Sequence, residues 1–202
     1  MFTRNKDFNI ILATAGYKFS HFKQYPPGTE HVFSYFESRG GKFDETVFFG
    51  LQYLLKRYLE GVVVTQEKID EAEAKIEKYF GTKNMFNRVG WEHILKEHGG
   101  KLPVRICAVP EGMHVPTHNV LMTIENTDPK CYWLTNYLET MLVQVWYPTT
   151  VCTLSNSIRK TILEFLKKTG TPKLIDFKLH DFGYRGASSQ ESAALGSAAH
   201  LV

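Results

Sequence analysis

The spacing of apolar residues changes at Pro103, and this change constrains the fold class. Before Pro103 apolar residues recur at every third or fourth position over 44–60, 65–80 and 88–97, which predicts three helices. After it, alternating residues at 103–108 and an apolar run at 120–124 are bracketed by prolines, which predicts short antiparallel strands. A further strand is predicted over 31–37, rich in aromatic and β-branched residues. Helices and antiparallel strands together indicate an α/β fold of the α+β kind.

Several expectations concern individual elements. The 44–60 helix is expected to begin with Asp44 as its cap and to end at Gly61. Asp128-Pro129 is expected to open another helix that runs to Trp146, where Pro148 breaks the pattern before a last long helix over 149–168. His114 and His118 have i,i+4 spacing, but the intervening Pro116 excludes a regular helix, so we expect no metal site there.

The stretch 180–186 combines an acid, a cation, an imidazole and two aromatic rings in seven residues. It reads His-Asp-Phe-Gly-Tyr-Arg-Gly, follows a predicted strand at 173–179 and precedes a helix of small residues, the layout of a βα unit. Gly183 and Gly186 would permit a positive φ or a close approach to a ligand, and Ser188-x-x-Glu191 has the spacing of a capping box. A planar heterocycle carrying a phosphate would use such a stacking ring, guanidinium and helix N-terminus. The alternative is that the two aromatic residues belong to the core and that the acid and arginine form an ordinary ion pair.

Composition narrows the function classes. With 24 basic and 21 acidic residues the formal net charge is +3, too small to indicate a nucleic-acid-binding protein. Cys107, Cys131 and Cys152 are odd in number and widely spaced, which argues against a disulfide framework or zinc site and for a reducing compartment. No stretch resembles a signal peptide or a membrane span, so we expect a cytoplasmic protein with no membrane partner. The apolar end of the chain, inside a predicted helix, suggests either a cut chain or a second polypeptide that completes it.

A dozen segments, in order along the whole chain, resemble the nicotinamide phosphoribosyltransferase family. They are 9–14, Tyr17-Lys18, His21, 23–27, 35–37, 45–48, 50–53, 109–112, 125–129, 131–136, 180–186 and 188–191. The resemblance implies transfer of phosphoribose from phosphoribosyl pyrophosphate to nicotinamide, giving nicotinamide mononucleotide and pyrophosphate in NAD salvage. It also implies a type II phosphoribosyltransferase with Mg²⁺ and ATP as cofactors, a homodimer with active sites at its interface, and a chain that is the N-terminal part of a longer protein.

The same resemblance supplies the domain and site expectations. Residues 1–147 would form the mixed α/β domain, and 148–202 would begin a barrel-like phosphoribosyltransferase domain. Phe182 and the partner subunit's Tyr17 would sandwich the nicotinamide ring, Arg185 would contact ligand oxygens, Arg39 would reach phosphate groups, and His180 would lie near the pocket wall. Where the family reads Thr-Asp-Ser-Tyr, this chain reads Thr-Ala-Gly-Tyr at 14–17, so the acid is missing and Gly16 loosens the turn. No catalytic residue is visible in this chain.

The sequence leaves two alternative functions open. The chain could be a non-catalytic truncated or split product that dimerises or binds ligand weakly. It could also be part of a relative that uses nicotinate, because no visible residue distinguishes an amide from a carboxylate. A downstream reading frame with the missing residues would separate the first alternative from an enzyme, and the charge of the pocket would separate the second.

Overall fold

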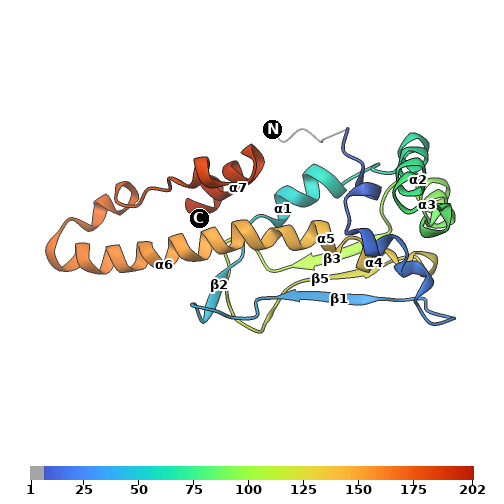
Figure 1. The fold of residues 1–202 in the computed structure, drawn as a ribbon. Helices are drawn as coiled ribbons and strands as arrows, with labels where there is room; N and C mark the ends of the chain where they lie inside the picture. Colours follow the sequence, from blue (N-terminus) through green and yellow to red (C-terminus); the bar gives the residue numbers. More distant parts are fainter. Residues whose placement is uncertain (1–6) are drawn as a thin grey trace. The chain divides into compact units, whose positions relative to one another are not determined.

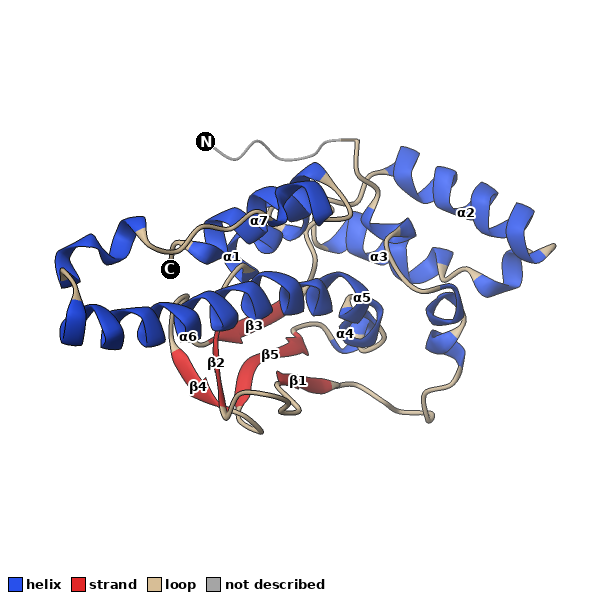
Figure 2. Cartoon of the chain, turned by 60° about the vertical axis from the view of Figure 1, so that its left-hand side comes forward, coloured by secondary structure: helices blue, strands red, loops and turns tan. Residues whose placement is uncertain are grey.

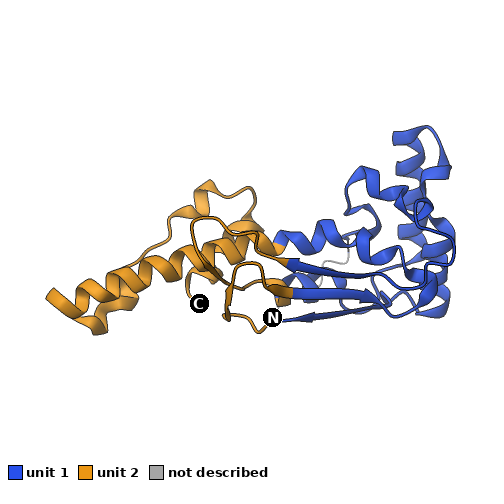
Figure 3. Ribbon diagram, turned by 90° about the horizontal axis from the view of Figure 1, so that it is seen from below, with its two compact units in different colours: residues 1–36, 53–108, 122–144 blue, residues 37–52, 109–121, 145–202 orange. Residues whose placement is uncertain are grey.

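The computed structural model describes residues 7–202, which form two compact units (Figure 3). The first unit comprises the described residues up to Phe36, together with Tyr53–Ala108 and Met122–Gln144. The second comprises Glu37–Gln52, Val109–Leu121 and Val145–Val202. The mixed α/β composition expected from the sequence is confirmed, with helices outnumbering strands in the described chain. Whether residues 148–202 begin a barrel-like domain stays a prediction.

Three strands form the sheet of the first unit, in the order β1–β5–β3 (Figure 1). They are β1 (Phe33–Glu37), β3 (Val104–Ala108) and β5 (Val120–Asn126). β3 and β5 run antiparallel, with register pairs from Val104↔Asn126 to Ala108↔Met122. The strand predicted over 31–37 and the antiparallel strands predicted after Pro103 are therefore confirmed. Prolines and turns bound these strands because proline cannot donate a ladder hydrogen bond.

Two helices of the first unit match the sequence pattern closely. α2 (Gln66–Phe80) begins at Thr65, whose side chain accepts a hydrogen bond from the Lys68 N–H, and ends at Gly81 with φ 71°. α3 (Arg88–Glu97) begins at Asn87, whose side chain caps it. Both helices bury most of the apolar face that the spacing predicted, but Tyr79 on α2 is exposed and Leu95 on α3 is only partly buried. Local capping and periodicity therefore determine these two elements.

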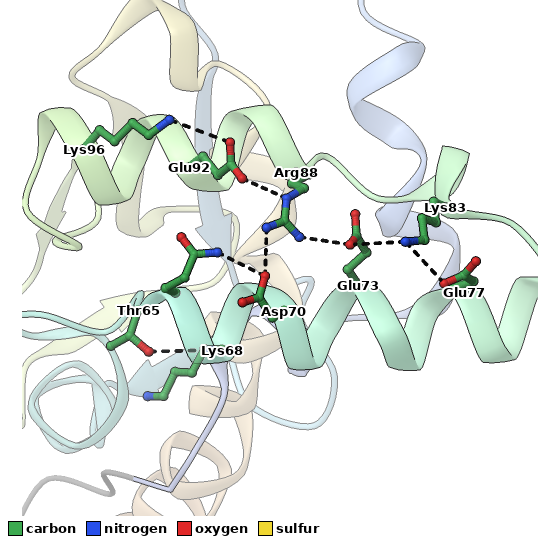
Figure 4. Close-up of polar contacts among 10 residues, drawn as sticks. Thr65, Lys68, Asp70, Glu73, Glu77, Lys83, Arg88, Glu92 and Lys96 are labelled. Carbon is green, nitrogen blue, oxygen red and sulfur yellow. Dashed lines mark hydrogen bonds and ion pairs between the residues drawn. The ribbon is translucent and has the colours of Figure 1, made fainter.

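Arg88 joins α2 to α3 (Figure 4). Its Nη2 lies 2.7 Å from Asp70 Oδ1 and its Nη1 lies 2.9 Å from Glu73 Oε2, both on α2, while Nε lies 2.7 Å from Glu92 Oε1 on its own helix. Three carboxylates raise the pKa of Arg88 above its ordinary value, with the hydrogen bond to Asp70 the largest cause. One planar guanidinium satisfies all three because its donors point in fixed directions. The guanidinium therefore links α2 to α3 through contacts with Asp70 and Glu73.

The remainder of the first unit consists of short helical turns rather than long helices. Three 3₁₀ turns cover Ile10–Leu12, Gly16–Phe19 and His21–Lys23, and another covers Lys83–Met85. The single helix predicted between Asp128 and Trp146 is wrong, because this segment divides into a 3₁₀ turn at Pro129–Cys131, α4 (Leu134–Tyr137), α5 (Glu139–Leu142) and a 3₁₀ turn at Val143–Val145. The last residue of α4, Tyr137, makes a long-range contact, since its buried hydroxyl donates to the Ile11 carbonyl at 2.5 Å. Long-range packing therefore overrides the local pattern here.

The predicted helix over 44–60 is wrong in its first half. Glu45–Val47 forms β2, which pairs antiparallel with β4 (His114–Pro116) in the second unit. Helical structure begins only at α1 (Leu51–Leu54) and continues as a π-helical turn over Leu55–Leu59. Gly50 prevents an earlier start because its φ is 107°, and a Cβ there would lie 2.5 Å from Pro148 Cγ. Asp44 therefore caps no helix.

Two helices dominate the second unit, α6 (Trp146–Thr169) and α7 (Gln190–His200), and they lie side by side (Figure 2). Pro148 occupies the first turn of α6 and does not break the pattern, since a proline there costs no intrahelical hydrogen bond. Small residues on α7 allow close packing: a Cβ on Gly196 would lie 3.1 Å from the Tyr147 hydroxyl. No helix in the described part of the chain is both long and apolar enough to span a membrane.

Candidate functional site

The stretch 180–186 lies in the second unit, between a 3₁₀ turn at Pro172–Phe177 and α7. The strand predicted over 173–179 is wrong: Pro172 starts helical turns instead, and only Ile175 is buried within them. No described strand pairs with this segment. The 3₁₀ turns are tied to α6 by an ion pair between Arg159 Nη2 and Asp176 Oδ1 at 2.7 Å. The expected βα unit is therefore absent from the described structure, although the helix that follows the stretch is present.

His200 fastens the start of the stretch to the helices. Its Nε2 lies 3.3 Å from the Leu179 carbonyl oxygen, and its Nδ1 lies 2.9 Å from the Ser155 hydroxyl on α6. Because a carbonyl only accepts, Nε2 donates to Leu179 and Nδ1 of the neutral ring accepts from Ser155. The imidazole thus links the end of α7, the middle of α6 and the residue before His180. Sequence reasoning missed this role, since nothing in the spacing of residues 155, 179 and 200 brings them together.

Inside the stretch, Asp181 and Gly183 define the turn. Asp181 Oδ1 accepts a hydrogen bond from the Gly183 N–H at 2.8 Å, an Asx turn that leads into the 3₁₀ turn Gly183–Gly186. A Cβ at Gly183 would lie 2.9 Å from that same oxygen, so a larger residue there would displace the Asp181 carboxylate from the turn. Neither Gly183 nor Gly186 has a positive φ, so of the two uses expected for these glycines only the close approach to a ligand stays a prediction. α7 is capped by Ser189, which accepts from the Ser192 N–H at 3.0 Å, and not by the predicted Ser188–Glu191 box.

The aromatic and charged side chains of the stretch face solvent. Phe182 is 77% exposed, and Tyr184, His180 and Arg185 are exposed as well. The rings of His180 and Phe182 lie 6.5 Å apart. The described residues offer Arg185 no ion-pair partner, and Asp181 uses one oxygen within the turn. A core role for the rings and an Asp181–Arg185 ion pair are therefore both contradicted, and a stacking surface beside a free guanidinium is what the stretch offers a ligand.

Tyr17 lies in the first unit, on the 3₁₀ turn Gly16–Phe19, with its ring 63% exposed and 5.2 Å from that of His21. The turn is firmly held. Lys18 is only 3% exposed, and its Nζ contacts the carbonyl of Asn136 at 3.0 Å, the side-chain oxygen of the same residue at 2.5 Å, and Glu139. Gly16 has no positive φ. Whether Gly16 loosens the turn stays a prediction, while the buried Lys18 anchors the residue that follows Tyr17.

Arg39 lies in the loop between β1 and β2, in the second unit, and is exposed. The loop is closed by two backbone hydrogen bonds, from His118 N–H to the Ser38 carbonyl and from Thr117 N–H to the Asp44 carbonyl, both at 2.9 Å. Gly40 has a φ of 88°, which sharpens the bend after Arg39. The structure thus brings His180, Phe182 and Arg185 together in one turn, places Arg39 in a separate loop of the same unit, and places Tyr17 in the other unit.

A cavity of about 520 Å³ opens beside this loop in the second unit, between β2 and α6. Glu45 lines this cavity and contacts two basic side chains. Its Oε1 lies 2.9 Å from His114 Nδ1 and 3.0 Å from Lys160 Nζ. The hydrogen bond from His114, followed by that from Lys160, holds the pKa of Glu45 below its usual range. The His114 imidazole therefore pairs with the Glu45 carboxylate and not with His118. His118 lies in the turn that follows β4 and has a φ of 62°.

Comparison with known proteins shows which family the chain is similar to. Residues 9–106 match the family described as "Nicotinamide phosphoribosyltransferase, N-terminal domain". A nicotinamide phosphoribosyltransferase of Xanthomonas campestris pv. campestris is 53% identical over 96% of the chain and 41% of its own length. Proteins of the same name from Acinetobacter baylyi and Mycoplasma pneumoniae are 32% and 30% identical, over 96% and 98% of the chain and 41% and 48% of their own lengths. The chain spans less than half the length of these relatives.

Proposed function

We propose that this chain, which is similar over nearly its whole length to the N-terminal part of nicotinamide phosphoribosyltransferases, supplies the nicotinamide-binding side of such an enzyme. The reaction would join the ring nitrogen of nicotinamide to the anomeric carbon of phosphoribosyl pyrophosphate while the bond to pyrophosphate breaks. The products would be nicotinamide mononucleotide and pyrophosphate. The observation that carries the proposal is the exposed, anchored turn 180–186 in a chain 53% identical to such a relative.

Each exposed side chain of the turn has a role under this proposal. Phe182 would stack on the pyridine ring, which holds the ring nitrogen in line with the anomeric carbon. Arg185 would pair with phosphate or ribose oxygens, because its guanidinium has no competing carboxylate among the described residues. His180 would line the pocket beside Phe182, to whose ring it lies close. We further propose a homodimer in which the partner subunit's Tyr17 covers the opposite face of the nicotinamide, and Arg39 reaches phosphate groups.

Mg²⁺ and ATP are proposed cofactors of the whole enzyme. Magnesium is bound by one or two carboxylates together with substrate phosphates. Asp181 is the one carboxylate within 180–186, and one of its oxygens already accepts from Gly183. These residues alone do not form a magnesium cage, so no step of the proposal passes through the metal. Because Phe182 and Arg185 lie in open solvent, where water weakens electrostatic stabilisation, we expect negligible turnover from the chain by itself.

A chimera tests the proposal directly. This chain would replace the matching N-terminal portion of the Xanthomonas campestris relative, and mononucleotide formation would be measured with nicotinamide and with nicotinate. We expect product from nicotinamide. A chimera that is folded by circular dichroism, yet forms no product while the intact relative does, would refute the proposal. Preferential use of nicotinate would favour the acid-using relative, which Arg185 could also serve by pairing with a carboxylate.

A further inference from the structure

Four side chains that could bind a metal ion converge in the first unit, apart from the residues of the candidate site described above. They are His93, His98, Asp128 and Cys131, and their potential ligand atoms all lie within 4.8 Å of one another. His93 Nε2 and His98 Nε2 each lie 2.7 Å from Asp128 Oδ2. We propose that these four residues bind a zinc ion. The proposal does not rest on the transferase function.

The backbone brings the two histidines to the same side. His93 lies on α3, and His98 is the residue at which α3 ends, with φ −113°. The N–H groups of His98 and Gly100 both donate to the Ile94 carbonyl at 3.1 Å, so the chain turns sharply at the helix end. In an uninterrupted helix, the residue five positions after His93 would lie on another face. The sharp turn instead places His98 next to His93. Both imidazoles therefore present Nε2 to one point.

Asp128 and Cys131 face that point from a single 3₁₀ turn. Asp128 caps the turn and Cys131 is its last residue, and the Cys131 N–H donates to the Asp128 carbonyl at 2.9 Å, so the two residues lie next to each other. Asp128 Oδ1 accepts from the Lys130 N–H at 2.8 Å, which leaves Oδ2 directed at the histidines. The buried Asn126 side chain donates to the Asp128 carbonyl at 2.8 Å and fixes the start of the turn. The ligands are thus positioned by backbone and by neighbouring hydrogen bonds, as metal ligands usually are.

The ligand atoms of these four residues suit zinc. Two imidazoles, one thiolate and one carboxylate complete a four-coordinate site, and the two negative ligands balance a divalent cation. Bonds of about 2.0–2.1 Å in a tetrahedron separate nitrogen and oxygen ligands by about 3.3 Å. Each Nε2 must therefore move roughly half an ångström from Oδ2, with its proton shifting to Nδ1. The Cys131 thiol loses its proton to solvent as the metal–sulfur bond forms.

Burial permits both a closed site and access to it. Cys131 is fully buried, whereas the side chains of His93 and Asp128 are 17% exposed and that of His98 is 29% exposed. An ion would enter beside the partly exposed His98 side chain and bind the buried Cys131 sulfur. With four protein ligands the site has no open position for a substrate, so its role is structural. It would fasten the end of α3 to the segment that follows β5.

The test uses the full chain after removal of metals with a chelator. Zinc binding is measured by titration calorimetry, and cobalt is used as a coloured substitute whose thiolate charge-transfer band reports on sulfur. We expect one ion per chain and a charge-transfer band. Cys131→Ala should abolish the band, and His98→Gln should weaken zinc binding by about 100-fold or more. Asp128→Asn keeps a capping side chain and so tests the carboxylate without removing the cap.

Matched controls come from the same chain. Cys107→Ala removes an exposed thiol on β3, and His114→Gln removes an exposed imidazole on β4; both should leave binding unchanged. Failure of the unmodified chain to bind one equivalent of zinc would overturn the proposal. So would a cobalt band that survives Cys131→Ala or disappears in Cys107→Ala. In those cases the four residues form only a hydrogen-bonded cluster around Asp128.

Discussion

Lys18→Met should destabilise the turn that presents Tyr17. Lys18 is buried, and its ammonium contacts two oxygens of Asn136 and the carboxylate of Glu139. Methionine keeps the length of the side chain, so apolar packing is largely retained and the loss is mainly that of the charged contacts. Glu139 is 55% exposed, and water can solvate it once the lysine is gone. The full penalty of a stranded buried charge therefore does not apply.

The magnitude follows from these contacts. A hydrogen bond to a charged group contributes about 1.5–3 kcal/mol when it is buried, and an exposed ion pair contributes less than about 1 kcal/mol. Allowing for solvent at Glu139, we expect a loss of about 1–3 kcal/mol in the free energy of unfolding. For a chain of this size that corresponds to a fall in Tm of roughly 2–12 °C. Urea unfolding measures the first quantity, and amide hydrogen exchange at Gly16–Phe19 localises it.

Lys23→Met is the matched control, because Lys23 ends the neighbouring 3₁₀ turn and is exposed. It should change the free energy of unfolding by less than about 0.5 kcal/mol. Equal effects of the two substitutions would refute the account of Lys18. So would unchanged hydrogen exchange at Gly16–Phe19 in Lys18→Met, because the exposed Tyr17 ring would then owe its position to something else.

Two further substitutions test other parts of the structure. Arg88→Met should cost about 1–2 kcal/mol in the free energy of unfolding, because three carboxylates lose one partly exposed guanidinium. A smaller effect at high salt than at low salt would support that cause, and an effect below about 0.3 kcal/mol at low salt would contradict it. His200→Ala should increase amide exchange across 180–186, because it removes the contacts with Leu179 and Ser155. Ser155→Ala removes one of the two contacts and should increase exchange less. If amide exchange across 180–186 is the same in both variants as in the unmodified chain, the imidazole does not hold the turn.

Local signals in the sequence predicted the elements whose stability is local. α2 has Thr65 at its start and Gly81, with positive φ, at its end, and its apolar residues recur at helical spacing. α3 likewise has its bounds set by Asn87 and by the residues after Glu97. The strands after Pro103 were predictable because alternation and proline both act over a few residues.

The wrong predictions share a long-range cause. Residues 45–47 have apolar spacing that fits a helix, but pairing with β4 and the hydrogen bond from Val47 N–H to the Thr153 hydroxyl make them a strand. Residues 173–179 have no partner strand among the described residues, so their β-like composition has nothing to pair with. Neither outcome is visible from a window of neighbouring residues.

The candidate site was located in part by sequence. The stretch 180–186 was singled out by its composition, and the structure exposes it as a ligand site would require, while the roles of Tyr17, Arg39, His180, Phe182 and Arg185 stay predictions. His200 and Lys18 were missed because each acts through a contact with residues distant in sequence. The same holds for His93, His98, Asp128 and Cys131, whose spacing resembles no compact metal motif.

The central claim is that Phe182 stacks on nicotinamide, and one comparison within the chimera described above tests it. Phe182→Ala removes the ring proposed to stack, whereas Phe177→Ala removes a ring of similar exposure, 71% against 77%, outside 180–186. Loss of about 1 kcal/mol of stacking should raise KM for nicotinamide at least about fivefold in Phe182→Ala. Phe177→Ala should leave KM unchanged, with both variants as stable as the parent. An unchanged KM in Phe182→Ala, or an equal rise in both variants, would contradict the claim.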